Sequence, residues 1–99
     1  MLLGKLVAGG VDFRVESTTH ALKRMEEREV GHDAVISTLQ ELSCKIMAYN
    51  DTGEEIAVID QEHDLAVIVE VRMNKVVIIT VIDRADIYLK DGTMLEKIA

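Results

Sequence analysis

The chain has no proline and no tryptophan, and only three of its 99 residues are aromatic. It has no proline-, glycine- or serine-rich stretch that could serve as a linker, and it is too short to bury a second core, so we expect a single domain over residues 1–99. The core must be built from Val, Ile, Leu and Met, because nearly half of the residues are apolar. With so few rings, a surface that stacks on nucleic-acid bases is poorly supported.

A single cysteine, Cys44, excludes an intramolecular disulfide and a cysteine-based metal knuckle, which fits a reducing compartment. The uninterrupted apolar runs, such as Val76 to Ile79, are far shorter than the roughly 20 residues that cross a bilayer. The first residues, MLLGKLVAGG, include a lysine and too few apolar residues for a signal peptide. We therefore expect a cytoplasmic protein that does not engage a membrane.

Negative charge predominates, with a formal net charge of −7 at pH 7. Residues 1–48 carry six basic and seven acidic side chains, whereas residues 49–99 carry five and eleven. Nucleic-acid-binding proteins contact phosphates mainly through Lys and Arg, so this balance counts against a general nucleic-acid binder without excluding a local basic groove. The acidic second half instead favours a partner with a basic surface.

Periodicity predicts the order of the elements. Val11–Ser17 alternates like a strand with one buried face, and a helix follows from about His20 to Glu29, capped by Thr18 or Thr19 and ended by Gly31. A second helix is predicted by the apolar stripe in residues 32–42. Four further strands, which short turns make antiparallel to their neighbours, are predicted at 45–50, 54–60, 65–73 and 75–83.

These elements predict an α+β fold, with two short N-terminal helices packed on a curved, mainly antiparallel sheet of four to five strands. The segment Val76–Ile82 is apolar on both faces, so we expect it to be the central strand, covered by the helices on one side and by the tail or a second copy on the other. A homodimer is therefore a further expectation. In residues 65–73 the side chains expected to face the core are Val67, Val69, Val71 and Met73.

His20, Arg24 and Arg28 fall on one line of the first predicted helix. An imidazole can exchange a proton near neutral pH, and two guanidinium groups can bind a phosphate and stabilise charge that develops on it. Cleavage of RNA by its own 2′-hydroxyl needs these functions and no metal. The alternative is that both arginines form ion pairs with Glu27, Glu16 or the acidic second half.

The stretch STTHALKRMEEREVGHDAV, residues 17–35, resembles the start of a small family of domains of unknown function, which opens roughly as S-x-H-A-x-x-R-M-x-x-R-x-I/V. The resemblance covers about residues 16–83 and includes a last strand similar to V-V-V-x-T-V-Y, which leaves residues 84–99 as a C-terminal extension. That family is usually placed with the RelE/ParE-like (barnase-EndoU-colicin-RelE) superfamily. The resemblance therefore implies two helices on a curved antiparallel sheet.

Several members of that wider group are metal-independent ribonuclease toxins. The resemblance thus implies an endoribonuclease of the toxin type, or an inactive derivative of one, with RNA as a partner and His20, Arg24, Arg28 and Thr80 as the catalytic residues. Where the family often has an aromatic hydroxyl after T-V, this chain has Ile82. A group that contacts RNA in its place would have to come from elsewhere, such as Arg84 or Tyr88.

The second hypothesis is a non-catalytic binding protein on the same fold: an immunity factor, an antitoxin-like partner or a phage-encoded inhibitor. A toxin-type protein would in turn bind a cognate antitoxin. The acidic residues expected to contact a basic partner are Glu54, Glu55, Asp60 and Glu62. His32 and His63 lack the ligand spacing of a metal site, so we expect no metal and no cofactor. Composition favours the binding protein and the motif favours the nuclease.

Overall fold

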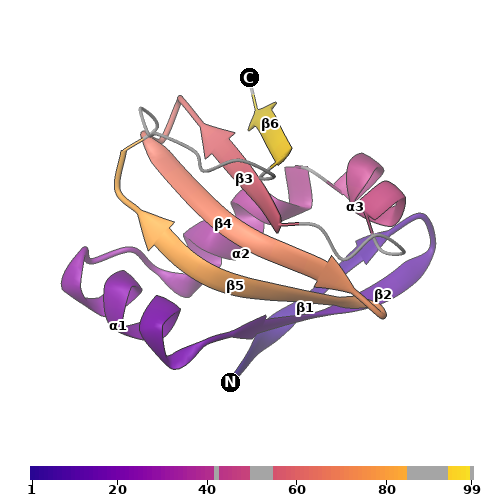
Figure 1. The fold of residues 1–99 in the computed structure, drawn as a ribbon, viewed down its shortest axis with the longest axis horizontal. Coiled ribbons are helices and arrows are strands. Elements are labelled where there is room, and N and C mark those ends of the chain that lie inside the picture. Colours follow the sequence, from indigo (N-terminus) through magenta and orange to yellow (C-terminus); the bar gives the residue numbers. More distant parts are fainter. Residues whose placement is uncertain (42, 50–54, 85–93, 99) are drawn as a thin grey trace.

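The computed structural model describes residues 1–41, 43–49, 55–84 and 94–98, which form three helices and six strands (Figure 1). Their bounds are β1 Leu2–Ala8, β2 Val11–Ser17, α1 Thr19–Glu27, α2 His32–Glu41, α3 Ser43–Tyr49, β3 Glu55–Asp60, β4 Leu65–Arg72, β5 Lys75–Ile82 and β6 Met94–Ile98. Figure 1 shows one twisted sheet with α2 running behind it. The predicted α+β class is confirmed.

The six strands form one sheet in the order β1-β2-β5-β4-β3-β6. Three neighbouring pairs are antiparallel, but β2 and β5, like β3 and β6, run parallel. The prediction of a mainly antiparallel sheet of four to five strands is therefore corrected to a mixed one. The cause is the crossover: three helices lie between β2 and β3, so β2 is joined to the rest of the sheet by a long connection that permits parallel pairing.

Strand β5 lies between β2 and β4, as its two apolar faces predicted. Three elements were not predicted: β1, α3 and β6. Strand β1 pairs with β2 through a two-residue turn, Gly9-Gly10, in which both residues have positive φ, and a bulge between Leu2 and Gly4 interrupts the alternation that would have revealed it. Residues 45–50 were predicted as a strand, but Ser43–Tyr49 is helix α3, because so short an apolar run fits either period.

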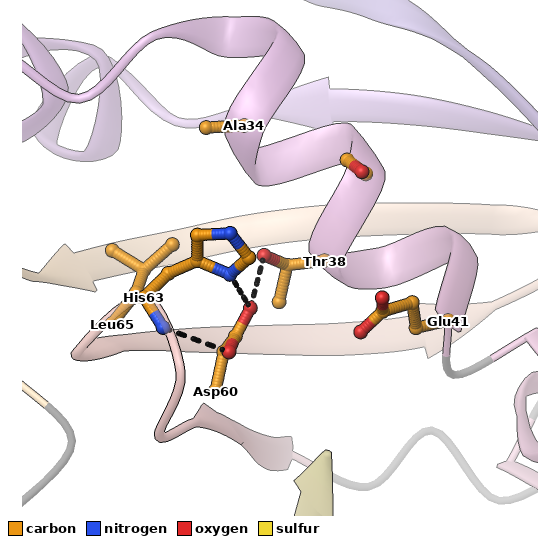
Figure 2. A pocket seen from close by; sticks show the side chains of 7 residues that line it. Ala34, Thr38, Glu41, Asp60, His63 and Leu65 are labelled. Atoms are coloured by element: carbon orange, nitrogen blue, oxygen red, sulfur yellow. Dashed lines mark hydrogen bonds and ion pairs between the residues drawn. The ribbon is translucent and has the colours of Figure 1, made fainter. Parts of the chain in front are cut away.

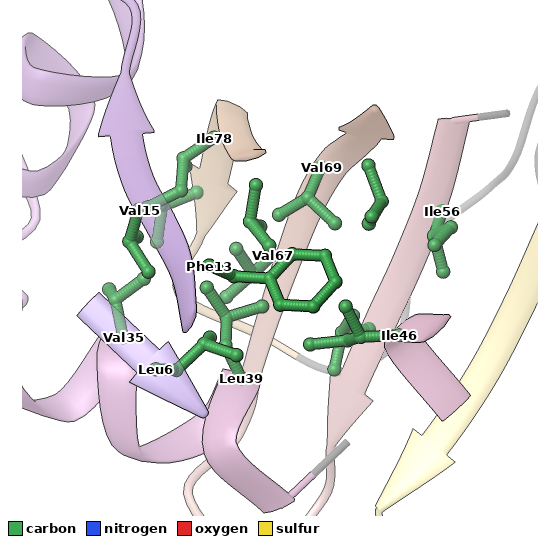
Figure 3. Packing of buried hydrophobic residues seen from close by; sticks show 14 of the residues in the cluster. Leu6, Phe13, Val15, Val35, Leu39, Ile46, Ile56, Val67, Val69 and Ile78 are labelled. Carbon is green, nitrogen blue, oxygen red and sulfur yellow. The ribbon is translucent and has the colours of Figure 1, made fainter. Parts of the chain in front are cut away.

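The main core lies between the sheet and all three helices. Phe13 is completely buried, and Figure 3 shows its ring in the middle of the cluster, near Val67 of β4 and Ile46 of α3. The helices contribute Ala21, Met25, Val35, Leu39 and Ile46 to this core. Of the side chains predicted to face it, Val67, Val69 and Val71 do so, whereas Met73 is 75% exposed in the β4–β5 turn, so that part of the prediction was wrong.

A second, smaller apolar cluster lies on the other face of the sheet. Its buried members are Ala57, Ile59, Ala66 and Ile68, with Ile79 and Ile82 packed against them. These side chains alternate along β3 and β4 with those of the main core, so the two clusters occupy opposite faces. On this face Ile79 and Ile82, which belong to the segment that suggested a homodimer, are only partly buried.

Thr18 joins the first helix to the centre of the sheet. Its hydroxyl accepts a hydrogen bond from the backbone N–H of Ala21 (3.1 Å), which caps α1, and lies 3.2–3.3 Å from the carbonyl oxygens of Ile78 and Ile79, to which it can donate. The predicted helix start is confirmed at Thr18. The helix ends at Glu27, before Glu29 adopts a left-handed φ of 55°, rather than at Gly31.

Candidate functional site

The basic ridge of α1, His20, Arg24 and Arg28, is where the sequence placed the catalytic residues. One Arg24 nitrogen lies 3.9 Å from Glu27, and Arg28 Nη1 lies 3.2 Å from Asp83 Oδ1 just after β5. Both guanidinium groups are thus engaged in partly exposed ion pairs, each of which contributes little to stability. Among the described residues the His20 side chain forms neither a hydrogen bond nor an ion pair, and it is exposed.

Thr80 does not lie with this ridge. It is paired with Ile68 across the β4–β5 ladder, and directly paired residues of antiparallel strands point to the same face. Ile68 belongs to the small cluster on the face away from the helices. The register shift between Ile68 and Val69 adds a residue to β5 and turns Thr80 to that side. Arg84 is exposed beyond the end of β5, and Tyr88 lies outside the described residues.

The four residues expected to contact a basic partner are not equivalent. Glu54 lies outside the described residues, Glu55 is half-buried at the start of β3, and Glu62 is exposed in the β3–β4 turn. Asp60 is only 2% exposed, so little of its carboxylate is accessible to a partner. Asp60 ends β3 with its side chain turned towards α2, where it already has protein partners.

Those partners are His63 and Thr38, as Figure 2 shows. Asp60 Oδ2 lies 2.8 Å from His63 Nδ1 and accepts a hydrogen bond from the Thr38 hydroxyl at 3.3 Å, while Asp60 Oδ1 accepts the backbone N–H of His63 at 3.1 Å. Thr38 is 3% exposed, whereas the His63 side chain is 65% exposed. The buried carboxylate therefore closes the β3–β4 turn and attaches it to α2, and it holds the His63 ring through Nδ1.

Asp60 and His63 each favour the charged form of the other. Burial acts to raise the pKa of Asp60, but the hydrogen bonds from the His63 ring and backbone, the charge of His63 and the Thr38 hydroxyl together hold it below 3.8. The hydrogen bond to Asp60 and then the charge of Asp60 raise the pKa of His63 above 6.5, and Glu62 and Glu41 add to this effect. Asp60 thus stays ionised, and His63 becomes cationic more readily than a free histidine.

Two adjoining hollows lie beside this pair. A small pocket of about 80 Å³ is lined by Ala34, Ser37, Thr38, Glu41, Asp60, His63 and Leu65. A wider, open hollow of about 440 Å³ is lined by Glu29, Val30, Gly31, Ala34, His63, Asp64, Leu65 and Asp83. Because they share Ala34, His63 and Leu65, we treat them as one feature, the acidic groove, between the α1–α2 connection, α2 and the β3–β4 turn. Its lining is partly apolar and otherwise mostly acidic.

The sequence suggested Asp60 as a contact for a basic partner and His63 as a weak metal-ligand candidate, but it did not connect the two residues. The signal that could have revealed the pair is the aspartate that ends a buried strand three residues before a histidine. The groove has no such local signal, because Glu29, Ala34, Leu65 and Asp83 come from four separate segments. Within the described residues, no group of three or more His, Cys, Asp and Glu side chains is placed to hold a metal ion.

None of the helices in the described part of the chain is long and apolar enough to cross a membrane. No protein-family model, curated protein or solved structure matches this chain. The resemblance to RelE/ParE-like domains therefore stays a prediction, and a function has to be inferred from the geometry of the chain itself.

Proposed function

We propose that this protein is a non-catalytic binding protein whose acidic groove receives a basic segment of a partner protein. The observation that carries the proposal is the combination of an apolar lining, formed by Val30, Ala34 and Leu65, with carboxylates from separate elements around it. An apolar side chain flanked by Lys or Arg matches both features at once. The acidic residues that line the two hollows are Glu29, Glu41, Asp60, Asp64 and Asp83.

The ion pair between Arg28 and Asp83 fits this role. The two side chains are 45% and 46% exposed, so the pair is weak, and an incoming arginine or lysine can take the place of Arg28 at little cost. The net charge of −7 adds a long-range field that speeds the encounter with a basic partner. High salt should slow this encounter.

The same charges make the groove a poor site for phosphate chemistry. Asp60 holds the Nδ1 side of the His63 ring, but the nearby carboxylates, Glu41, Glu62 and Asp64 among them, would repel a phosphate substrate. Binding without catalysis is therefore the function that this part of the molecule supports best.

The proposal can be tested with a fluorescent peptide in which one leucine is flanked by lysines and arginines, by measuring its anisotropy at low salt. We expect Glu29→Gln and Asp83→Asn each to weaken binding about two- to fivefold, the loss expected for one partly exposed ion pair. Glu26→Gln is the matched control, because Glu26 is exposed on α1 but does not line the groove. Equal affinities for the wild type and all three variants would refute the proposal, as would no binding at low salt.

The second candidate is a metal-independent endoribonuclease with a RelE/ParE-like fold, as the motif in α1 implies. Its supporting observation is that the side chains of His20, Arg24 and Arg28 are all at least partly exposed on one line of α1, with no other element covering them completely. The test is cleavage of total RNA in the presence of a chelator by the wild type, His20→Ala and Arg24→Ala. Cleavage by the wild type that is lost in both variants would establish this activity. Intact RNA in every sample would exclude it.

A further inference from the structure

Four basic side chains lie in one line across the sheet. The cross-strand register pairs Lys5 of β1 with Arg14 of β2, Arg14 with Lys75 of β5, and Lys75 with Arg72 of β4. These four strands are consecutive neighbours in the sheet (Figure 1). We call these residues the basic row; neither sequence motifs nor the acidic groove includes them.

The basic row lies on the face of the sheet that the helices leave uncovered. Directly paired residues point to the same side of a sheet, and chain neighbours point to the other side. Leu6, Phe13, Val71 and Val76, which are neighbours of the four basic residues, are all buried in the main core under the helices. The row therefore points away from the helices. Lys5 is exposed, the Arg14 and Arg72 side chains are 59% and 62% exposed, and Lys75 is half-buried.

This arrangement is unfavourable for the protein alone, because like charges placed directly opposite one another in a sheet repel. A chain of net charge −7 nevertheless places four of its 11 Lys and Arg residues in this line. The arginines are partly compensated: Arg14 Nε lies 3.7 Å from Glu16, and Arg72 Nη2 lies 3.3 Å from Glu70. Lys5 and Lys75 form no ion pair among the described residues. A partner with negative charges would relieve the repulsion that remains.

The surroundings of the row indicate what kind of partner fits. With strands about 4.8 Å apart, four positions span roughly 14 Å. The next line of the same face contains Glu16 and Glu70, both paired with Val77, and Asp12 lies on the other side of Arg14. A nucleic-acid strand, which is negative throughout, would meet these carboxylates, and the row and its flanks offer no aromatic ring for its bases.

An acidic protein segment fits this pattern better. It can place carboxylates over the row and neutral or basic residues over the flanking glutamates, and each arginine can donate two parallel hydrogen bonds to one carboxylate. We propose that the basic row docks an acidic segment of a partner protein, laid across β1, β2, β5 and β4. This surface is separate from the acidic groove, so the proposal does not depend on the function proposed above.

The test uses a fluorescent glutamate-rich peptide as the probe, with the full chain at low salt. Lys75 is the residue to change, because it lies between two arginines and forms no ion pair within the part of the chain that the structure describes. We expect Lys75→Gln to weaken peptide binding about three- to fivefold. Lys23→Gln, which removes the same charge from the exposed side of α1, should leave binding unchanged. An oligouridylate of the same length should bind more weakly than the peptide.

A second measurement does not need a ligand. If the row is under repulsion, Lys75→Gln should raise the midpoint of thermal unfolding of the free protein, while Lys23→Gln, which loses a contact of 4.0 Å to Glu27, should not. Binding that is equally weakened by both substitutions, or a lower unfolding midpoint together with unchanged binding in Lys75→Gln, would overturn the proposal. Tighter binding of the oligouridylate than of the peptide would overturn the assignment to a protein partner.

Discussion

At the scale of single residues, the buried carboxylate of Asp60 joins three parts of the chain. It holds the β3–β4 turn against α2 through Thr38 and sets the orientation and the charge of His63. A residue with this many hydrogen bonds is expensive to leave unpaired, because its desolvation is offset only by those contacts. The charge states of the pair therefore predict how stability depends on pH.

Because the pKa of Asp60 is lowered in the folded protein, its contribution to stability is present above its ordinary value of 3.8 and is lost as the pH falls through the lowered value. Because the pKa of His63 is raised, its contribution is complete below 6.5 and is lost as the pH rises through the raised value. The ion pair between Asp60 and His63 should thus stabilise the fold most between pH 3.8 and pH 6.5.

We expect Asp60→Asn to return the pKa of His63 towards 6.5, which NMR titration of the His63 ring protons can measure. The difference in unfolding midpoint between the wild type and this variant should be larger at about pH 5 than at about pH 8. Glu62→Gln is the control, since the charge of Glu62 is a smaller contribution to the His63 shift. An unchanged His63 titration in Asp60→Asn would contradict the geometry described for the pair.

At the scale of elements, two hairpins use two-residue turns whose residues both have positive φ. Gly9-Gly10 suits the β1–β2 turn, because glycine adopts this conformation without steric cost. The β4–β5 turn contains Met73 and Asn74, with φ values of 53° and 59°. Asparagine tolerates such values, but methionine is strained there and also exposes an apolar side chain.

We therefore expect Met73→Asn to increase the free energy of unfolding by up to about 1 kcal/mol, because asparagine is favoured at the first position of such a turn. Met73→Val should lower it by about 1–2 kcal/mol, since a β-branched side chain fits a left-handed conformation worst. Urea denaturation measures both changes. A Met73→Asn variant that is less stable than the wild type would show that the turn differs from the one described.

At the scale of the whole molecule, the distribution of apolar surface decides whether the chain needs a second copy. Both faces of the sheet contain buried clusters, and the exposed large apolar residues in the described part of the chain are Met1, Leu2, Val7 and Met73. Three of these lie on or beside the edge strand β1, where Lys5 interrupts them; a charge on an edge strand disfavours pairing between copies.

We therefore expect a monomer, and light scattering of the purified protein should give a mass close to 11.0 kDa over a range of concentrations. A mass near twice this value would instead support the homodimer that the two apolar faces of residues 76–82 suggested. Adding the β1 substitution Val7→Lys to such a dimer would then test whether the exposed edge forms the interface.

The sequence by itself determined the elements that have a clear period. The sequence predicted helices α1 and α2, strands β2 to β5, a helix cap at Thr18 or Thr19, and the orientation of Val67 towards the core. Periodicity and capping depend only on residues close together in the chain. Strand β1, helix α3 and strand β6 could not be predicted. A bulge interrupts the pattern of β1, and the segments of α3 and β6 are too short to distinguish the two periods.

Only the tertiary structure decided which elements lie beside one another and in which register. The parallel pairing of β2 with β5, the burial of Asp60, the outward turn of Thr80 and the alignment of Lys5 with Lys75 all follow from contacts between distant segments. Period shows on which side of its own element a side chain lies, but the register between elements depends on how their surfaces pack. For that reason the acidic groove and the basic row, both built from several elements, have no counterpart in any continuous motif.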